Sequence, residues 1–230
     1  MTGKLYIVAT PIGNLEDITL RALSVLKSVD LIACEDTRHT KILLDRHNIH
    51  RPLISYHQHS RLQNLTRILE ALAAGQSVAL VTDAGTPGIS DPGNILVHDA
   101  VAAGIKVEPI PGPSALIALA SVAGIAMDRF LFLGFLPHKK GRQTSIQQMM
   151  ISKVPVIFYE STHRILKTLE ALTGAPGLLV IGRELTKKFE EIVRGRPREV
   201  LEYFQTHETA GEFVVVYSPS DNNQDDIPFD

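Results

Sequence analysis

The chain has 230 residues, of which 44% are hydrophobic and 21% are charged, a composition typical of a globular protein with one large domain or two small ones. Its apolar runs are short, far below the roughly 18–20 residues that cross a bilayer, so we expect no membrane span. The N-terminus begins directly with a strand-like run, which argues against a secretory signal. The single cysteine, Cys34, excludes an internal disulfide and a CxxC zinc site. These features predict a cytoplasmic protein.

The formal net charge of −2 does not by itself indicate a nucleic-acid partner. Residues 219–230 carry four acids and no Lys or Arg, so removing them leaves a body with a net charge of +2. This segment is polar and aperiodic, which predicts an acidic, disordered tail. In the body, basic residues gather in three loops, at His138, Lys139, Lys140 and Arg142, at Lys187 and Lys188, and at Arg194, Arg196 and Arg198. Such clusters are usually solvated surface; they permit RNA binding without establishing it.

The first half of the chain alternates strand-like and helix-like segments. Short apolar runs typical of buried strands occur at residues 5–9, 30–34, 78–82 and 106–110. Apolar residues spaced three and four apart predict helices from about Asp17, at 61–75, at 92–103 and at 113–122. This βαβ alternation predicts a mainly parallel sheet with helices on both faces.

The second half differs, because strands outnumber the clear helices. Strand-like runs occur at 129–135, 154–159, 178–182 and 212–217, with one clear helix at 162–172 and a second possible at 142–152. Segment 190–204 indicates a strand that turns into a short helix. We therefore predict an α/β protein with an N-terminal α/β lobe at 1–123, a C-terminal α+β lobe at 124–218 and the tail at 219–230.

Four loops that follow predicted strands are rich in Gly and Pro, at residues 9–14, 82–93, 109–115 and 134–141. In open parallel sheets, ligands bind at the carboxyl ends of the strands. A loop with so many glycines costs chain entropy unless the backbone must come close to something or adopt a special dihedral angle. Four such loops at one sheet edge predict a pocket lined mainly by main-chain groups. The phosphate-binding pattern GxxxxGK[ST] and the dinucleotide pattern GxGxxG are both absent, which also argues against a Rossmann-type methyltransferase.

Eight ordered segments between about residue 4 and residue 218 are distinctive: LYIVATPIGNLEDIT, IACEDTRHT, VTDAGTPGISDPG, IPGPSA, GFLP, YESTHRI, GRELTKKFEE and GEFVVV. In this order they resemble the bacterial ribosomal RNA small-subunit methyltransferase I group of the tetrapyrrole-methylase superfamily. The resemblance implies a two-lobed tetrapyrrole-methylase-like fold, a homodimer, and S-adenosylmethionine-dependent 2′-O-methylation of a cytidine ribose in the decoding region of small-subunit ribosomal RNA. One departure is that members often carry a further basic, helical C-terminal extension, where this chain has its acidic tail.

The resemblance also implies which residues contact the cofactor, in a cleft between the lobes. They are Pro11, Gly85, Thr86, Pro87, Ile89, Ser114, Ala115, Tyr159, Gly211 and Phe213. Ser114 suits this role because a helix N-terminus offers free N–H groups to the methionine carboxylate. It could equally be a plain helix N-cap.

A ribose hydroxyl is a poor nucleophile, so a nearby carboxylate acting as a base would assist methyl transfer. Glu35, Asp36 and Glu184 are the candidates, and the sequence does not choose among them. Asp36 could instead cap a helix beginning near Thr37, and Asp91 could cap the helix beginning near Pro92. The candidate phosphate contacts are basic residues that could also be ordinary surface: Arg38, Lys139, Lys140, Arg183, Lys187 and Lys188.

Three other functions remain open. The HxH pair of His57 and His59, with Asp83, His98, Asp99 and His163 elsewhere, leaves a metal-dependent hydrolase conceivable, although no ligand motif is recognisable and we expect no metal. A tetrapyrrole or other small-molecule methylase is a second alternative. The third is an RNA-binding module that keeps the fold without the reaction.

Overall fold

The structure, a computed structural model, describes residues 2–57 and 61–219. The chain divides into two compact units, Met1–Ser114 and Ala115–Asp230. Among the described residues, no helix is both long enough and apolar enough to cross a membrane.

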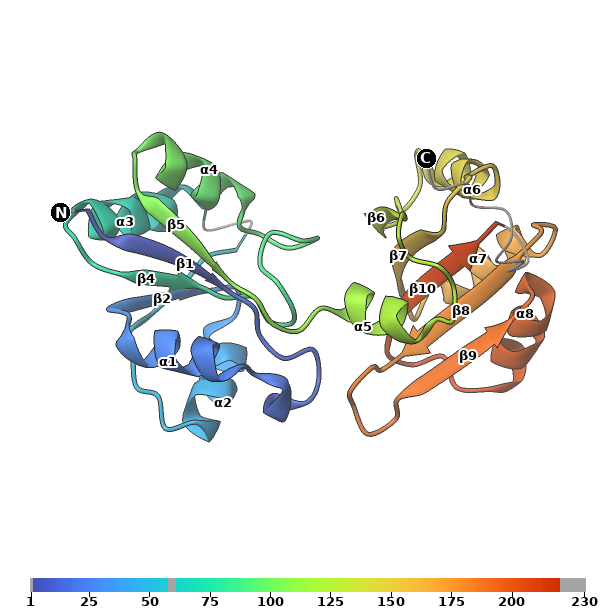
Figure 1. Ribbon diagram of the computed structural model, residues 1–230, viewed down its shortest axis with the longest axis horizontal. Coiled ribbons are helices and arrows are strands. Elements are labelled where there is room, and N and C mark those ends of the chain that lie inside the picture. Colours follow the sequence, from blue (N-terminus) through green and yellow to red (C-terminus); the bar gives the residue numbers. More distant parts are fainter. Residues whose placement is uncertain (1, 58–60, 220–230) are drawn as a thin grey trace. The chain divides into compact units, whose positions relative to one another are not determined.

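The first unit is built on a five-stranded sheet in the order β3-β2-β4-β1-β5 (Figure 1). Its strands are β1 (Lys4–Val8), β2 (Leu31–Cys34), β3 (Leu53–Ser55), β4 (Val78–Leu80) and β5 (Lys106–Ile110). Every neighbouring pair is parallel. The carboxyl ends of all five strands therefore lie along one side of the sheet, which we call the first-sheet edge; its loops are 9–14, 35–36, 82–93 and 111–114.

Helices cover both faces of this sheet (Figure 1). One face carries α1 (Leu20–Ser28), which follows a short 3-10 turn (η1, Leu15–Asp17), and α2 (Thr37–Arg46); the other carries α3 (Arg61–Ala73) and α4 (Asn94–Ala102). Successive side chains of a strand point to opposite faces. Ile32 and Cys34 accordingly pack on the side of α1 and α2, and Ala33 on the side of α3 and α4. A sheet buried on both faces explains why its strands are continuous apolar runs.

The second unit has a five-stranded mixed sheet in the order β6-β7-β10-β8-β9. Its strands are β6 (Leu131–Phe135), β7 (Val156–Ser161), β8 (Leu178–Arg183), β9 (Glu191–Gly195) and β10 (Glu212–Ser218). β6 and β7 are parallel, and the other pairs are antiparallel. The carboxyl ends of β6, β7 and β8 therefore share a side with the starts of β9 and β10. We call this side the second-sheet edge; its loops are 136–141, 162–164, 184–190 and 207–211.

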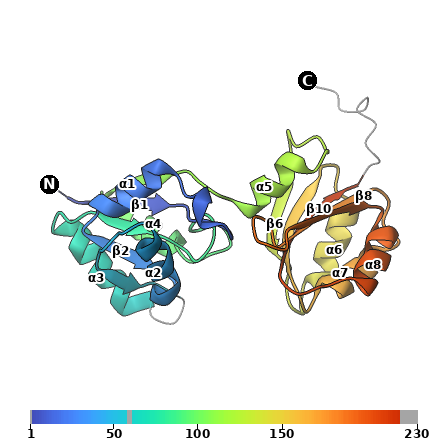
Figure 2. The ribbon, with the colours of Figure 1, turned by 90° about the horizontal axis from the view of Figure 1, so that it is seen from below.

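One face of the second sheet is covered by α6 (Arg142–Met150), α7 (Ile165–Leu172) and α8 (Pro197–Thr206) (Figure 2). Helix α5 (Ala115–Val122) packs on the opposite face, over β10 and β8. Gly182 of β8 makes room for it, since a Cβ there would lie 3.0 Å from Leu119 Cδ1. Packing of α5 on β10 explains why the division falls at Ser114/Ala115, whereas the sequence placed a boundary at 123/124.

The predicted α/β fold with a parallel first sheet is confirmed, and the optional helix at 142–152 and the strand-to-helix segment at 190–204 are both present. The sequence did not predict β3. This strand has three residues, none fully buried, and lies at the edge of the sheet. The predicted tail lies outside the described residues from 220 onward.

Candidate functional site

Three glycine- and proline-rich loops are joined at the first-sheet edge. Main-chain hydrogen bonds run from Thr10 N to Gly85 O (2.8 Å) and from Gly85 N to Thr10 O (3.1 Å). The Thr86 hydroxyl donates to Pro113 O at 3.4 Å, which links loop 82–93 to the loop after β5. A Cβ on Gly112 would lie 3.0 Å from Ala9 Cβ, so the first and third loops also touch. The chain thus presents a continuous main-chain surface here.

Loop 82–93 needs its glycines for backbone reasons. Gly85 and Gly88 have φ values of +82° and +83°, and Gly93 has +154°. Side chains rarely adopt this region, so each glycine permits a bend that another residue would strain. Ser90 also lies there, at φ +62°.

The sequence placed four such loops at one sheet edge, and this was wrong for the fourth. Loop 134–141 follows β6 and therefore lies at the second-sheet edge, in the other unit. The sequence pattern identifies a strand but does not say which sheet the strand joins.

Three carboxylates surround Thr82 at the first-sheet edge. The Thr82 hydroxyl donates to Glu35 Oε2 at 3.2 Å, and Asp83 Oδ1 accepts from Asp36 N at 3.3 Å. Burial raises the pKa of Asp91 to about 6; a hydrogen bond with Thr82 opposes the rise, and the nearby charges of Glu35 and Asp83 add to it. Asp91 is therefore an acid that changes its charge near pH 6.

The suggestion that Asp91 caps the following helix is wrong. The N-cap of α4 is Gly93, and no side chain makes a cap hydrogen bond there. The helix begins at Asn94, directly after Gly93 with its φ of +154°, and Asp91 makes no hydrogen bond to its first turn. The carboxyl is left beside Thr82 instead.

Asp36, in contrast, is a helix cap, which was the alternative to its role as a base. Its Oδ1 accepts from Arg38 N at 2.8 Å at the start of α2. Its Oδ2 pairs with Arg38 Nη2 at 2.7 Å. Hydrogen bonds from the Arg38 side chain and main chain hold the pKa of Asp36 far below its ordinary value. Its carboxylate is therefore engaged and a weak base.

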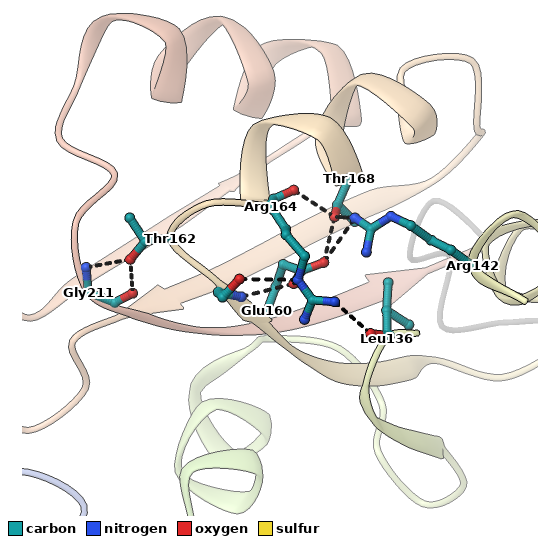
Figure 3. A network of polar contacts seen from close by, with 8 residues as sticks. Leu136, Arg142, Glu160, Thr162, Arg164, Thr168 and Gly211 are labelled. Atoms are coloured by element: carbon teal, nitrogen blue, oxygen red, sulfur yellow. Dashed lines mark hydrogen bonds and ion pairs between the residues drawn. The ribbon is translucent and has the colours of Figure 1, made fainter. Parts of the chain in front are cut away.

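At the second-sheet edge, a buried carboxylate organises the loops (Figure 3). Glu160 of β7 is fully buried and pairs with Arg164 Nε at 2.8 Å and Arg142 Nη2 at 3.1 Å; it also accepts from the Thr168 hydroxyl at 2.7 Å. Arg164 Nη1 in turn donates to Leu136 O at 2.8 Å, just after β6. This network ties the loop after β6 to β7 and α7.

The sequence carries a signal for this network, although none of its side chains was among the predicted site residues. Phe158 and Glu160 occupy alternate positions of β7, and Phe158 belongs to the apolar core. A carboxylate on the same inward face requires buried partners. Nearby, the Thr162 hydroxyl donates to Gly211 O at 2.6 Å and accepts from Gly211 N at 3.0 Å, which joins the start of β10 (Figure 3).

Glu184 lies in a tightly bonded turn after β8. Its Oε1 accepts from Glu212 N at 2.9 Å and from Lys187 Nζ at 3.0 Å. Burial alone would raise its pKa, but these hydrogen bonds outweigh it and leave the pKa lowered. A Cβ on Gly211 would lie 2.5 Å from Glu184 Cγ, so the turn packs directly on Gly211. Glu184 therefore fixes the turn through its hydrogen bonds, and its role as a base stays a prediction.

The predicted phosphate contacts fall into two groups. Arg183 is largely buried and bonds to Glu191 Oε2 (2.9 Å) and Ala210 O (3.0 Å), and Lys187 pairs with Glu184 and Glu212. Arg38, Lys139, Lys140 and Lys188 are exposed; Arg38 is paired with Asp36. The three exposed lysines make no ion pair with any residue in the described ranges.

The structure brings the predicted cofactor contacts to the two edges. Pro11, Gly85, Thr86, Pro87 and Ile89 lie in loops of the first-sheet edge, and Ser114 directly precedes α5, which begins at Ala115. Gly211, Phe213 and Tyr159 lie at or beside the second-sheet edge. Within residues 2–57 and 61–219, no group of three His, Cys, Asp or Glu side chains could hold a metal ion. His59 of the HxH pair lies outside these ranges.

Comparison with known proteins identifies the family. Residues 4–201 match the model of the tetrapyrrole (corrin/porphyrin) methylases. The protein named ribosomal RNA small subunit methyltransferase I from Mesorhizobium japonicum is 47% identical over 96% of this chain and 77% of its own length. A protein of the same name from Thermotoga maritima is 43% identical over 94% of this chain and 98% of its own length.

Solved structures show the same fold at low identity. Cobalt precorrin-4 methyltransferase matches with a TM-score of 0.71 and 16% identity, over 94% of both chains. Diphthine synthase matches with a TM-score of 0.74 and 15% identity, over 94% of this chain and 90% of its own. Together with the sequence relatives, these matches show that the chain belongs to the tetrapyrrole methylase family, and within it to the ribosomal RNA small subunit methyltransferase I group.

Proposed function

We propose that this chain transfers a methyl group from S-adenosylmethionine to the 2′-hydroxyl of a cytidine ribose in small-subunit ribosomal RNA. The names of the relatives from M. japonicum and T. maritima support the reaction class and the substrate. The cytidine and the 2′-oxygen come from the resemblance of the sequence motifs to that group. A cytoplasmic homodimer is part of the same proposal.

The first-sheet edge suits a small cationic ligand. Its three joined loops offer main-chain N–H and C=O groups, and its charged side chains beside Thr82 are carboxylates. Carboxylates repel a polyphosphate and attract a cation. Pro11, Gly85, Thr86, Pro87, Ile89, Ser114 and Ala115 are the proposed contacts in these loops and directly after them. Tyr159, Gly211 and Phe213 of the second unit remain predicted contacts.

The cofactor, when bound, supplies a methyl group on a positively charged sulfur, which leaves as a neutral thioether. The protein must then orient the ribose hydroxyl and accept its proton as the new O–C bond forms. Of the three base candidates from the sequence, Asp36 and Glu184 are engaged in structural hydrogen bonds. Glu35 accepts one hydrogen bond, from Thr82.

Asp91 is a further candidate, and the one we favour as the base. It shares Thr82 with Glu35, and burial raises its pKa to about 6, so at pH 7 it is ionised yet basic enough to take a proton. As a carboxylate, Asp91 can accept the proton of the ribose hydroxyl directly. Glu35 is then the neighbouring charge that helps to keep Asp91 basic.

The observation that carries the proposal is the joining of loops 9–14, 82–93 and 109–115 beside Thr82 and its carboxylates. The test is to incubate the purified protein with small ribosomal subunits that lack the modification and with S-adenosylmethionine labelled in the methyl group. We expect label in the RNA at one cytidine, and resistance of the adjoining phosphodiester to alkali, since a 2′-O-methyl group blocks its cleavage.

Other outcomes would contradict the proposal in distinct ways. Label on a base rather than a ribose would retain the enzyme class and overturn the target atom. Cofactor binding without labelled RNA would favour a small-molecule methylase or an inactive RNA-binding module. Absence of cofactor binding by calorimetry would overturn the methyltransferase itself.

A further inference from the structure

Two exposed aromatic rings lie at the second-sheet edge. Phe135, at the end of β6, is 56% exposed, and Phe189, in the turn between β8 and β9, is 65% exposed. Isolated exposed apolar side chains are common on proteins. These two are distinguished by the fixed backbone that presents them and by the lysines beside them.

The Phe135 ring is set by an irregularity of β6. The β6–β7 register shifts between Phe132 and Phe135. In a regular strand, residues three apart point to opposite faces, but both rings contact Tyr159, with centroids at 5.2 Å and 5.3 Å. The shift therefore turns Phe135 onto the same face as Tyr159, as strand bulges commonly do. Arg164, held by Glu160, fixes the next residue through Leu136 O at 2.8 Å (Figure 3).

The Phe189 turn is held by several short contacts. Thr186 N donates to Glu190 Oε2 at 2.6 Å, and Lys187 N donates to Glu184 O at 3.0 Å. Lys187 itself pairs with Glu184 and Glu212. Phe189 thus projects from a turn that is held by hydrogen bonds of Thr186, Lys187 and Glu190.

Exposed lysines lie near each ring in the sequence. Lys139 and Lys140 follow Phe135 in the loop after β6, and Lys188 Nζ lies 5.5 Å from the centroid of the Phe189 ring. Aromatic rings combined with lysines are the features by which proteins bind single-stranded nucleic acid, because bases stack on the rings while cations contact the phosphates.

The strand order places both rings on the same side of the sheet. Phe135 ends β6 and Phe189 lies two residues before β9, so both belong to the second-sheet edge. β6 and β9 are separated by β7, β10 and β8, so the end of β6 and the start of β9 lie roughly 19 Å apart at the usual strand spacing. A single strand of RNA running along this edge could reach both rings with bases of different nucleotides.

We propose that Phe135 and Phe189 stack on unpaired bases of the RNA substrate, with Lys139, Lys140 and Lys188 contacting the phosphates between and beside them. This inference rests on the proposed function. It adds two aromatic contacts to the RNA-binding surface of the second unit, and these contacts do not select a particular base, because every base has a flat face that can stack.

The test compares Phe135→Ala and Phe189→Ala with Phe130→Ala. Phe130 is 37% exposed and precedes β6, so it lies at the opposite side of the same sheet and is a matched control. Methyl transfer to small subunits gives KM and kcat, fluorescence anisotropy gives the affinity for a labelled single-stranded RNA oligonucleotide, and calorimetry gives the affinity for S-adenosylmethionine.

We expect each edge variant to raise KM and weaken oligonucleotide binding about 5- to 100-fold, the range that loss of one stacked base produces. For Phe189→Ala, kcat and cofactor affinity should stay within about twofold of wild type, and Phe130→Ala should change nothing. Phe135 contacts Tyr159, a predicted cofactor contact, so Phe135→Ala is judged on KM and oligonucleotide affinity. Phe135→Trp and Phe189→Trp should restore binding, because an indole stacks at least as well as a phenyl ring.

Three results would overturn the inference: unchanged KM and RNA affinity in both alanine variants, failure of both tryptophan variants to bind better than alanine, or a loss confined to cofactor binding. Failure of the proposed function has a different signature. In that case the wild-type protein transfers no methyl group to small subunits, while oligonucleotide binding still reports whether the rings contact RNA.

Discussion

The two sheet edges of this protein are built from different groups. At the first-sheet edge, main-chain hydrogen bonds such as those between Thr10 and Gly85 join the loops, and the side chains around Thr82 are acidic. At the second-sheet edge, buried side chains such as Glu160 and Arg164 hold the loops, and the exposed side chains include lysines and aromatic rings.

We infer from this difference that the first-sheet edge contributes most to cofactor binding and that the exposed lysines and rings of the second-sheet edge contribute to RNA binding, with Tyr159, Gly211 and Phe213 as the cofactor contacts predicted from the second unit. A main-chain surface with carboxylates suits a small cationic ligand whose shape is read by the backbone. A rigid edge with exposed cations and rings suits a polyanion that is gripped along its length. Substitutions at the first-sheet edge should therefore weaken cofactor binding without unfolding the protein. Substitutions of the exposed rings and lysines at the second-sheet edge should weaken RNA binding.

The largest expected effect is on cofactor affinity at Gly85. A Cβ there would lie 3.6 Å from Ile12 Cγ2 and 3.9 Å from Pro113 O, which are ordinary contacts, but φ is +82°, so valine would strain the backbone at the place where the three loops join. We expect Gly85→Val to abolish binding of S-adenosylmethionine in calorimetry while the protein stays folded.

Gly104→Val is the matched control for that substitution. Gly104 has φ +71° and no atom within 4 Å of a built Cβ, and it precedes β5, so it lies at the opposite edge of the same sheet. Both variants carry similar backbone strain, about 1–3 kcal/mol. If Gly85→Val and Gly104→Val lose cofactor binding equally, the loss is due to general destabilisation, and the first-sheet edge is not the cofactor site.

The next effect is on the stability of the second unit. Glu160→Ala would leave Arg142 and Arg164, both largely buried, without their shared carboxylate. Removing one partner of a buried ion pair costs about 3–5 kcal/mol. Urea unfolding should show this loss, whereas Glu170→Ala, an exposed position on α7, should stay within about 0.5 kcal/mol of wild type. Equal stabilities of the two variants would contradict a structural role for the network.

Much of the fold could be predicted from the sequence because the strands are apolar runs and the helices have clear periodicity. Strand β3 could not, since three half-exposed residues at a sheet edge leave no pattern. The placement of loop 134–141 also failed, because local patterns do not specify which sheet a strand joins.

The candidate site was predictable in part. The glycine loops were visible from composition, and their joining through Thr10 and Gly85 agrees with the predicted main-chain surface. The roles of acids were not visible, since they depend on distances within the fold. Asp36 and Glu184 turned out to be engaged by Arg38 and Lys187, while Asp91 lies beside Thr82 instead of capping α4.

A moderate effect is expected on the rate of methyl transfer at Asp91. Asp91→Asn should lower kcat about 100-fold, the lower range for loss of a general base. In the wild-type protein, kcat/KM should rise with pH through about 6, because kcat/KM reports the ionisation of the unbound enzyme and Asp91 must lose its proton to act. A pH–rate profile of the wild type without this rise, or an Asn variant with normal kcat, would exclude Asp91 as the base.

Ionisation of Asp91 should have the opposite effect on stability: the free energy of unfolding should fall as the pH rises, whereas activity should rise. The folded pKa of Asp91 is raised from 3.8 to about 6, so its contribution to stability is fully present below about pH 4 and is lost as pH rises to 6. Asp91→Asn cannot ionise and should lack this decline. Urea unfolding at several pH values between 4 and 7 measures the difference.

The smallest effect is expected at Asp36, where two substitutions separate capping from catalysis. Asp36→Ala removes the acceptor for Arg38 N at the start of α2 and should lower the melting temperature by a few degrees. Asp36→Asn keeps a good N-cap and should preserve both stability and methyl transfer, because the carboxylate is already committed to Arg38. If the Asn variant is as stable as wild type but loses methyl transfer, then Asp36 takes the proton. In that case Asp91 contributes only negative charge to the electrostatic potential at the first-sheet edge.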